Sequence, residues 1–125
     1  MVNLGVGFAA ETPRINSTGQ VAGNVGFADG NSRAFFWTPA SGMRDIGSLG
    51  SGQSGAIAMN ALGQVVGESP PARGRDPHAF SWRPGGRMVD LGTFGGPRSY
   101  ASRINRQGTI VGGAMLRDGS FHGFA

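Results

Sequence analysis

A motif that occurs three times along the 125-residue chain restricts the possible folds more than any other feature of the sequence. It reads Ile-Asn-x-x-Gly-Gln-Val-Ala-Gly from Ile15, and it returns in similar form from Met59 and from Ile104. The steps are 44 residues (15 to 59) and 45 residues (59 to 104). Self-similarity at a fixed period of this size indicates a repeated structural unit that packs on its neighbours.

Two further elements recur in fixed order between the copies of this motif. One is aromatic: it reads Ala-Phe-Phe-Trp at 34–37, returns at 79–82 and begins again at 123–125. The other reads Met-Arg-Asp-Ile-Gly at 43–47, returns at 88–92 and has a first copy in Met1-Val2-Asn3-Leu4-Gly5. We therefore expect a single repeat domain over 1–125, with units at 1–42, 43–87 and 88–125. The first unit begins with the last strand of a preceding one, and the third is truncated.

Each unit is expected to form four short antiparallel strands. In the best-defined copy they cover 56–59, 64–68, 78–83 and 88–92. Asn-x-x-Gly is typical of a type I turn, and its glycine can take the left-handed conformation of a hairpin bulge. Glycines interrupt every window that could form a helix. The sequence therefore predicts an all-β protein.

A period of about 45 residues with four strands per unit is typical of a β-propeller blade. We expect about three four-stranded antiparallel blades, as an incomplete ring or as part of a larger propeller. A β-solenoid is less favoured, because its strands are parallel and the turns here are hairpin turns. Packing between blades is assigned to Leu62, Val65, Phe80, Trp82 and Leu91, with their repeat equivalents.

Three blades fall short of a closed ring, since propellers usually have about 4–8. Two apolar blade faces would stay open, and open apolar faces normally mean a partner or further chain. Either the sequence is an excerpt of a longer repeat array, or two copies associate and supply six blades. The end of the chain within a third strand favours the excerpt.

The three linked motifs resemble the HAF-type probable extracellular repeat family of bacteria, over nearly the full chain. The resemblance implies a repeat protein, often predicted to be exported, with no established enzymatic role. It therefore implies an extracellular or periplasmic location, although no signal peptide is visible in this sequence. The chain departs from the pattern where Arg33 replaces a histidine, where 47–51 lacks a doubled glycine, and where Gly123 replaces an alanine.

Composition excludes several kinds of site. The chain has no cysteine, which excludes disulfides, thiolate zinc sites and cysteine nucleophiles. All 11 basic residues are arginine, so lysine chemistry is also excluded. The net charge of +4 is modest and disfavours a nucleic-acid partner. No apolar run approaches the roughly 18 residues of a membrane-spanning helix.

The residues that could carry chemistry have a structural interpretation that we favour. Asp45 and Asp90, with Asn3 at the equivalent place, recur once per blade and are expected to accept turn amides or pair with arginine. His78 and His122 share a repeat position, but Arg33 breaks the set that a metal would need. The Gly5-x-Gly7-x-x-Ala10 pattern, with Asp29, lacks the helix that a dinucleotide site requires.

Other candidates are weaker still. The loop serines Ser41, Ser48 and Ser69 lack a nucleophile elbow, and Asn16-Ser17-Thr18 is a glycosylation sequon on a turn. Trp37 and Trp82 could stack on sugars, but core packing is favoured. Arg73 and Arg75 lie in a loop that varies between units, and they are the best candidates for an anionic contact.

We therefore predict no catalytic residue, cofactor or metal. The leading hypothesis is a non-catalytic extracellular repeat domain that acts as a structural or protein-interaction module. The alternative is a lectin-like carbohydrate-binding propeller, assembled from several chains. Weak polyanion binding through arginine comes third, and an enzyme stays open because propellers do host active sites.

Overall fold

The structure is a computed structural model, and it describes residues 10–125. Every regular element in this range is a β-strand, which confirms the all-β prediction. The range holds no helix that is long and apolar enough to cross a membrane. The N-terminal segment Met1–Gly5, with Asn3 and most of the Gly5–Ala10 pattern, lies outside the described residues.

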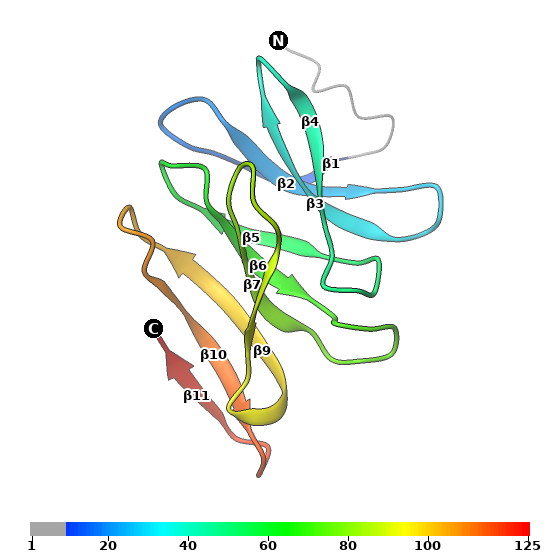
Figure 1. The fold of residues 1–125 in the computed structure, drawn as a ribbon, viewed down its shortest axis with the longest axis vertical. Helices are drawn as coiled ribbons and strands as arrows, with labels where there is room; N and C mark the ends of the chain where they lie inside the picture. The colour runs from blue at the N-terminus through cyan, green and yellow to red at the C-terminus, as the bar shows by residue number, and fades with distance from the viewer. Residues whose placement is uncertain (1–9) are drawn as a thin grey trace.

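The strands form three antiparallel sheets that follow one another along the long axis of the molecule (Figure 1). The first sheet contains β1 (Ala10–Ile15), β2 (Val21–Gly26), β3 (Ser32–Thr38) and β4 (Gly42–Gly47), in that order. The second contains β5 (Gly55–Met59), β6 (Val65–Ser69), β7 (His78–Trp82) and β8 (Val89–Gly92), again in order. The third contains β9 (Gly95–Ile104), β10 (Ile110–Leu116) and β11 (Phe121–Phe124), with β10 in the centre. No sheet closes on itself within 10–125, so the structure establishes three antiparallel sheets of four, four and three strands, and a propeller ring stays a proposal.

The Asn-x-x-Gly turn is the same in all three units. In each copy the glycine N–H donates to the asparagine carbonyl, at 3.1–3.2 Å. The three glycines have φ between +80° and +90°, as expected for a left-handed bulge position. This turn joins the first strand of each sheet to the second and fixes their register.

The first and second sheets share an apolar core. Phe36 on β3 packs on Trp82 on β7, with ring centroids 5.1 Å apart. Val65 and Phe80 are completely buried in the same cluster, which confirms three of the five residues assigned to packing between units. Ile46 on β4 is also buried there.

Two of the packing assignments were wrong. Leu62 is 64% exposed, because it lies inside an Asn-x-x-Gly turn that projects into solvent. Leu91 is 38% exposed, although its repeat equivalent Ile46 is buried. The physical difference is that Ile46 packs in the cluster with Phe36 and Trp82, whereas Leu91 lines an open pocket.

A second apolar cluster joins the second and third sheets, and it repeats the first cluster one unit further on. Val66, Ala79 and Ala101 form its buried centre, and Ile110 and Phe124 pack against it. These five residues stand at the repeat positions of Ala22, Ala34, Ala56, Val65 and Phe80 in the first cluster.

An asparagine ladder also connects the three sheets. Asn16 Nδ2 donates to the Asn60 carbonyl at 3.1 Å, and Asn60 Nδ2 donates to the Asn105 carbonyl at 3.0 Å. Each asparagine Oδ1 meanwhile accepts the backbone N–H four residues later in its own turn. The asparagine of the motif therefore stabilises its own turn in all three units, and the side chains of Asn16 and Asn60 also bond to the turn of the next unit.

Replacing Asn60 with aspartate is expected to lower the free energy of unfolding by about 2–3 kcal/mol. The new carboxylate would keep the turn acceptor but would face the Asn105 carbonyl and Gln64 Oε1, which now accept from Nδ2. The matched control is Asn105→Asp, because Asn105 is exposed and its side chain makes no bond to another sheet among the described residues. We expect that change to cost less than about 0.5 kcal/mol. Equal losses in urea denaturation would contradict the ladder.

Candidate functional site

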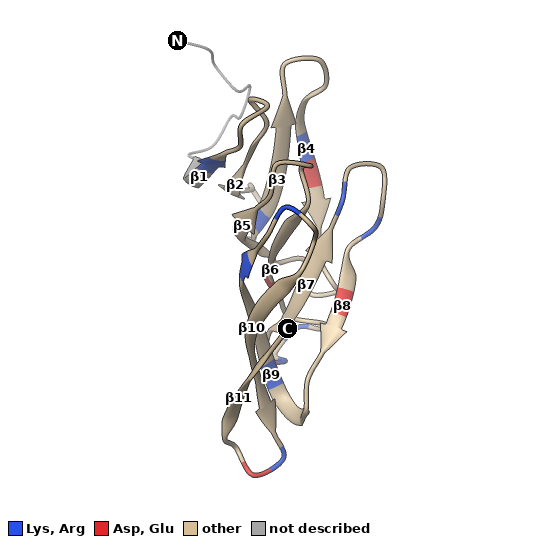
Figure 2. Ribbon diagram, turned by 90° about the vertical axis from the view of Figure 1, so that its left-hand side faces the viewer, with Lys and Arg blue, Asp and Glu red and all other residues tan. Residues whose placement is uncertain are grey.

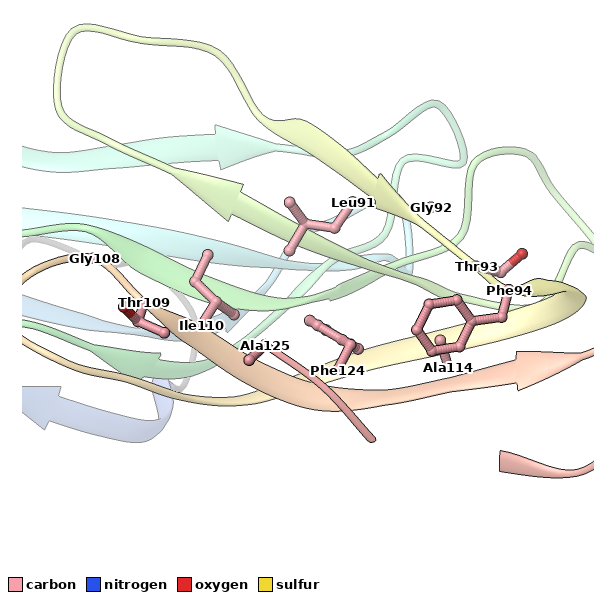
Figure 3. Close-up of a pocket in the computed structure, with 10 residues that line it drawn as sticks. All are labelled: Leu91, Gly92, Thr93, Phe94, Gly108, Thr109, Ile110, Ala114, Phe124 and Ala125. Atoms are coloured by element: carbon pink, nitrogen blue, oxygen red, sulfur yellow. The ribbon is translucent and has the colours of Figure 1, made fainter. Parts of the chain in front are cut away.

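An apolar pocket lies between the second and third sheets, and it is the first of two candidate binding sites. Its volume is about 440 Å³. Figure 3 shows Leu91 of β8 across from Ile110 of β10 and Phe124 of β11, with Phe94 at one end. Phe94 is 49% exposed, so a large part of its ring faces solvent. The pocket can accept an apolar side chain but offers no charged group to a ligand.

Three of the residues that line this pocket had been assigned to packing between units. They are Leu91, and Ile110 and Phe124 as the repeat equivalents of Val65 and Phe80. The structure brings these three side chains to an open pocket together with Phe94, which the sequence pattern did not single out.

The second candidate is a polar pocket of about 310 Å³, formed by three connections at one end of the first two sheets. The β2–β3 turn supplies Asp29 and Asn31, the β4–β5 connection supplies Gln53, and the β6–β7 connection supplies Arg73 and Arg75. Neither Arg73 nor Arg75 forms an ion pair within the described residues. The structure therefore brings the two predicted arginines to one pocket, together with polar residues that sequence reasoning did not connect with them.

Asp29, the acidic residue of this polar pocket, is held in place by hydrogen bonds within the β2–β3 turn. The backbone N–H of Asn31 donates to Asp29 Oδ1 at 2.9 Å, and Arg33 Nη1 lies 3.5 Å from Asp29 Oδ2. The Asn31 amide, followed by the charge of Arg33, holds the pKa of Asp29 below its usual value. A carboxylate, two amides and two guanidinium groups can together bond the hydroxyls of a sugar.

Titration of Asp29 is expected to show this environment. The pKa of Asp29 is lower in the folded chain than in the unfolded chain. Asp29 therefore stabilises the fold at pH values above its unfolded-state pKa, and this contribution is lost as the pH falls through its folded-state pKa. Carboxyl carbon NMR should give a midpoint for Asp29 below that of the same residue in the urea-unfolded chain. A midpoint at or above the unfolded one would contradict the hydrogen-bonded turn.

The two repeated aspartates have structural partners. Asp45 Oδ2 accepts from Arg33 Nε at 2.9 Å, and Asp90 Oδ2 lies 2.9 Å from His78 Nδ1. Each aspartate also accepts the backbone N–H of the glycine two residues later. The expectation of turn amides is confirmed for both aspartates and that of an arginine partner for Asp45, whereas Asp90 faces His78 instead of an arginine. Each pair joins two neighbouring strands of one sheet.

The remaining candidates are dispersed. Asn16 Nδ2 is engaged by Gln20 and by Asn60, so the sequon asparagine belongs to the interface between sheets. Ser69 is buried and accepts the Leu49 N–H, whereas Ser41 and Ser48 bond to their own loops. Trp82 is 7% exposed, which confirms core packing there and excludes a sugar platform; Trp37 is partly buried.

His122 lies exposed on β11 in the third sheet, whereas His78 belongs to β7 in the second. No group of three potential metal ligands occurs within 10–125. Acidic and basic residues are spread over several strands and loops (Figure 2). The sequence matches no known protein-family model and no curated protein, and the structure matches no solved one.

Proposed function

We propose that this chain is a non-catalytic repeat domain of propeller-like architecture that acts as a structural or protein-interaction module. The observation that carries the proposal is the apolar pocket between the second and third sheets, which is lined by Leu91, Phe94, Ile110 and Phe124. Pockets that accept apolar side chains are a common means of binding a peptide segment of a partner protein.

A non-catalytic role is supported by the use of the polar residues that stood out in the sequence. Asp45, Asp90 and His78 hold neighbouring strands together, and Asn60 holds neighbouring sheets. The resemblance to HAF-type repeats supports an extracellular or periplasmic location for such a module.

The proposal is tested with a peptide taken from the repeat itself. Residues 82–92 of this chain run from Trp82 through β8 and carry the apolar side chains that pack between sheets. The synthetic peptide should shift the backbone NMR signals of Leu91, Ile110 and Phe124 in the full chain. A peptide with alanine in place of tryptophan should bind at least tenfold more weakly. Shifts elsewhere, or none, would overturn peptide binding at this pocket.

The polar pocket supports the lectin-like alternative, with the site at Arg73 and Arg75 instead of at a tryptophan. A glycan array probed with the wild-type chain and with an Arg73→Gln/Arg75→Gln variant tests it. Signal from the wild type that the double variant loses would support carbohydrate binding. Equal signal from both, or silence from both, would remove this alternative.

A further inference from the structure

The polar pocket at one end of the first two sheets is built on a hydrogen-bonded frame. Gln53 Nε2, in the β4–β5 connection, donates to Asn31 Oδ1 in the β2–β3 turn at 3.2 Å. The Gln53 carbonyl accepts from Ser69 Oγ, at the end of β6, at 2.6 Å. These bonds link the three connections that line the pocket. Its polar groups are therefore held in place before a ligand arrives, which lowers the entropic cost of binding.

Close packing strengthens this frame. A Cβ at Gly50 would overlap the Pro71 carbonyl oxygen, so the β4–β5 connection lies directly against the β6–β7 connection. On its other side, Arg33 Nη1 donates to the Gly52 carbonyl at 3.0 Å. Arg33 Nε also pairs with Asp45, so the guanidinium group of Arg33 serves the frame.

Arg73 and Arg75 are the free cations of the pocket. Both are exposed, and within the described residues neither side chain has a hydrogen bond or an ion pair. They lie in the β6–β7 connection, which has eight residues (70–77), whereas the equivalent connections of the other sheets have five (27–31) and four (117–120). Connections that differ while the strands repeat are where binding specificity generally lies.

The free atoms of the pocket require a ligand with both donors and acceptors. The pKa of Asp29 is held below its usual value, chiefly by the Asn31 amide, so the Asp29 oxygens only accept. Gln53 Oε1 also only accepts, and it has no partner within the described residues. Arg73 and Arg75 only donate, and a planar guanidinium group matches the geometry of a carboxylate. A complementary ligand therefore combines a carboxylate with hydroxyl groups.

We propose that this pocket binds an acidic sugar of the uronate class, with its carboxylate on Arg73 and Arg75 and its hydroxyls donating to Asp29 and Gln53. The volume of about 310 Å³ is at the lower end of the range of ligand sites, which suits a single sugar ring. Two arginines and one aspartate give the lining a net charge of +1, which matches a ligand with one negative charge. This inference rests on the carbohydrate-binding alternative proposed above and names the class of sugar.

NMR titration of the full chain with matched methyl glycosides tests the inference. The acidic probes are the glucuronide and the galacturonide, and the neutral probes are the glucoside and the galactoside, which have a CH₂OH group in place of the carboxylate. At least one uronide should shift the side-chain signals of Arg73, Arg75 and Gln53, and it should bind at least tenfold more tightly than its neutral counterpart. Acetate supplies the carboxylate without the hydroxyls and should bind at least tenfold more weakly than that uronide.

Two double variants separate the pocket from general charge. Arg73→Gln/Arg75→Gln should weaken uronide binding at least tenfold, and the dispersion of its NMR spectrum shows that the chain still folds. The matched control is Arg103→Gln/Arg106→Gln, which removes two exposed arginines from the third sheet and its turn. Because the loss of charge is the same, this control should bind the uronide as the wild type does.

Each contrary result has a distinct meaning. Equal affinity for a uronide and its neutral counterpart, with shifts at the pocket, would overturn the acidic preference but leave the carbohydrate alternative standing. Acetate that binds as tightly as the uronide, or an equal loss in the control variant, would reduce the site to a simple charge contact and overturn the inference. No shift at the pocket with any of the four glycosides would overturn both the inference and the carbohydrate alternative.

Discussion

Replacement of Trp82 by alanine is expected to lower the free energy of unfolding by about 3–5 kcal/mol, the usual cost of truncating a buried tryptophan. The indole is 7% exposed and packs on Phe36 of the first sheet, so its removal leaves a cavity between two sheets. Both the lost burial and the cavity destabilise the fold. Urea denaturation followed by far-ultraviolet circular dichroism measures the change.

The control for this prediction is Trp37→Ala. Trp37 occupies the same repeat position on β3 but is only partly buried, so the loss should be clearly smaller. Trp82→Phe should recover part of the stability because it keeps an aromatic ring against Phe36. If Trp37→Ala costs as much as Trp82→Ala, the interface between the first two sheets does not have the importance assigned to it.

Replacement of Gly67 by alanine is expected to destabilise the chain by about 3 kcal/mol or more, at the upper end of overpacking effects. Gly67 lies opposite a bulge: Ala56 pairs with Gly67 and Ala58 with Val66, which leaves Ile57 as the extra residue. A Cβ at Gly67 would overlap the Gly55 carbonyl oxygen and press on the Phe80 ring. The carbonyl is backbone, so the strand itself would have to move. Thermal unfolding of the variant checks the loss.

A glycine in an open place provides the comparison. Gly26, at the end of β2, has an ordinary φ, and no atom lies within 4 Å of the position that a Cβ would occupy, so Gly26→Ala should be neutral or slightly stabilising. Gly112 is the repeat equivalent of Gly67 and should behave as Gly67 does, because its Cβ would overlap the Tyr100 carbonyl oxygen. A neutral Gly67→Ala would show that the bulge does not bring the two strands so close.

Much of the fold could be predicted because the repeat motif contains its own local physics. Asn60 and Gly63 specify a turn, and the β-branched Val65 and Val66 favour a strand after it. The structural role of Asp45 and Asp90 was also predictable, because a residue type that recurs once per unit most often bonds within its own unit. These interactions depend on neighbours in the same sheet.

What could not be predicted depends on how neighbouring sheets pack on each other. Leu91 and Ile46 are equivalent in sequence, yet only Ile46 is buried, because Ile46 packs in the cluster with Phe36 and Trp82, whereas Leu91 lines an open pocket. The two pockets likewise combine residues from separate sheets or connections. Arg73 could be singled out as a loop arginine, but its proximity to Asp29 and Gln53 emerges only when the sheets are stacked.

The central claim is that the units stack on one another through their apolar faces. Nuclear Overhauser effects between the Phe36 ring and the Trp82 indole test it most directly, since these rings belong to different sheets and lie 5.1 Å apart between centroids. We expect strong cross-peaks between their ring protons in the folded chain. Resolved, dispersed signals from both rings with no cross-peak between them would contradict the stacking.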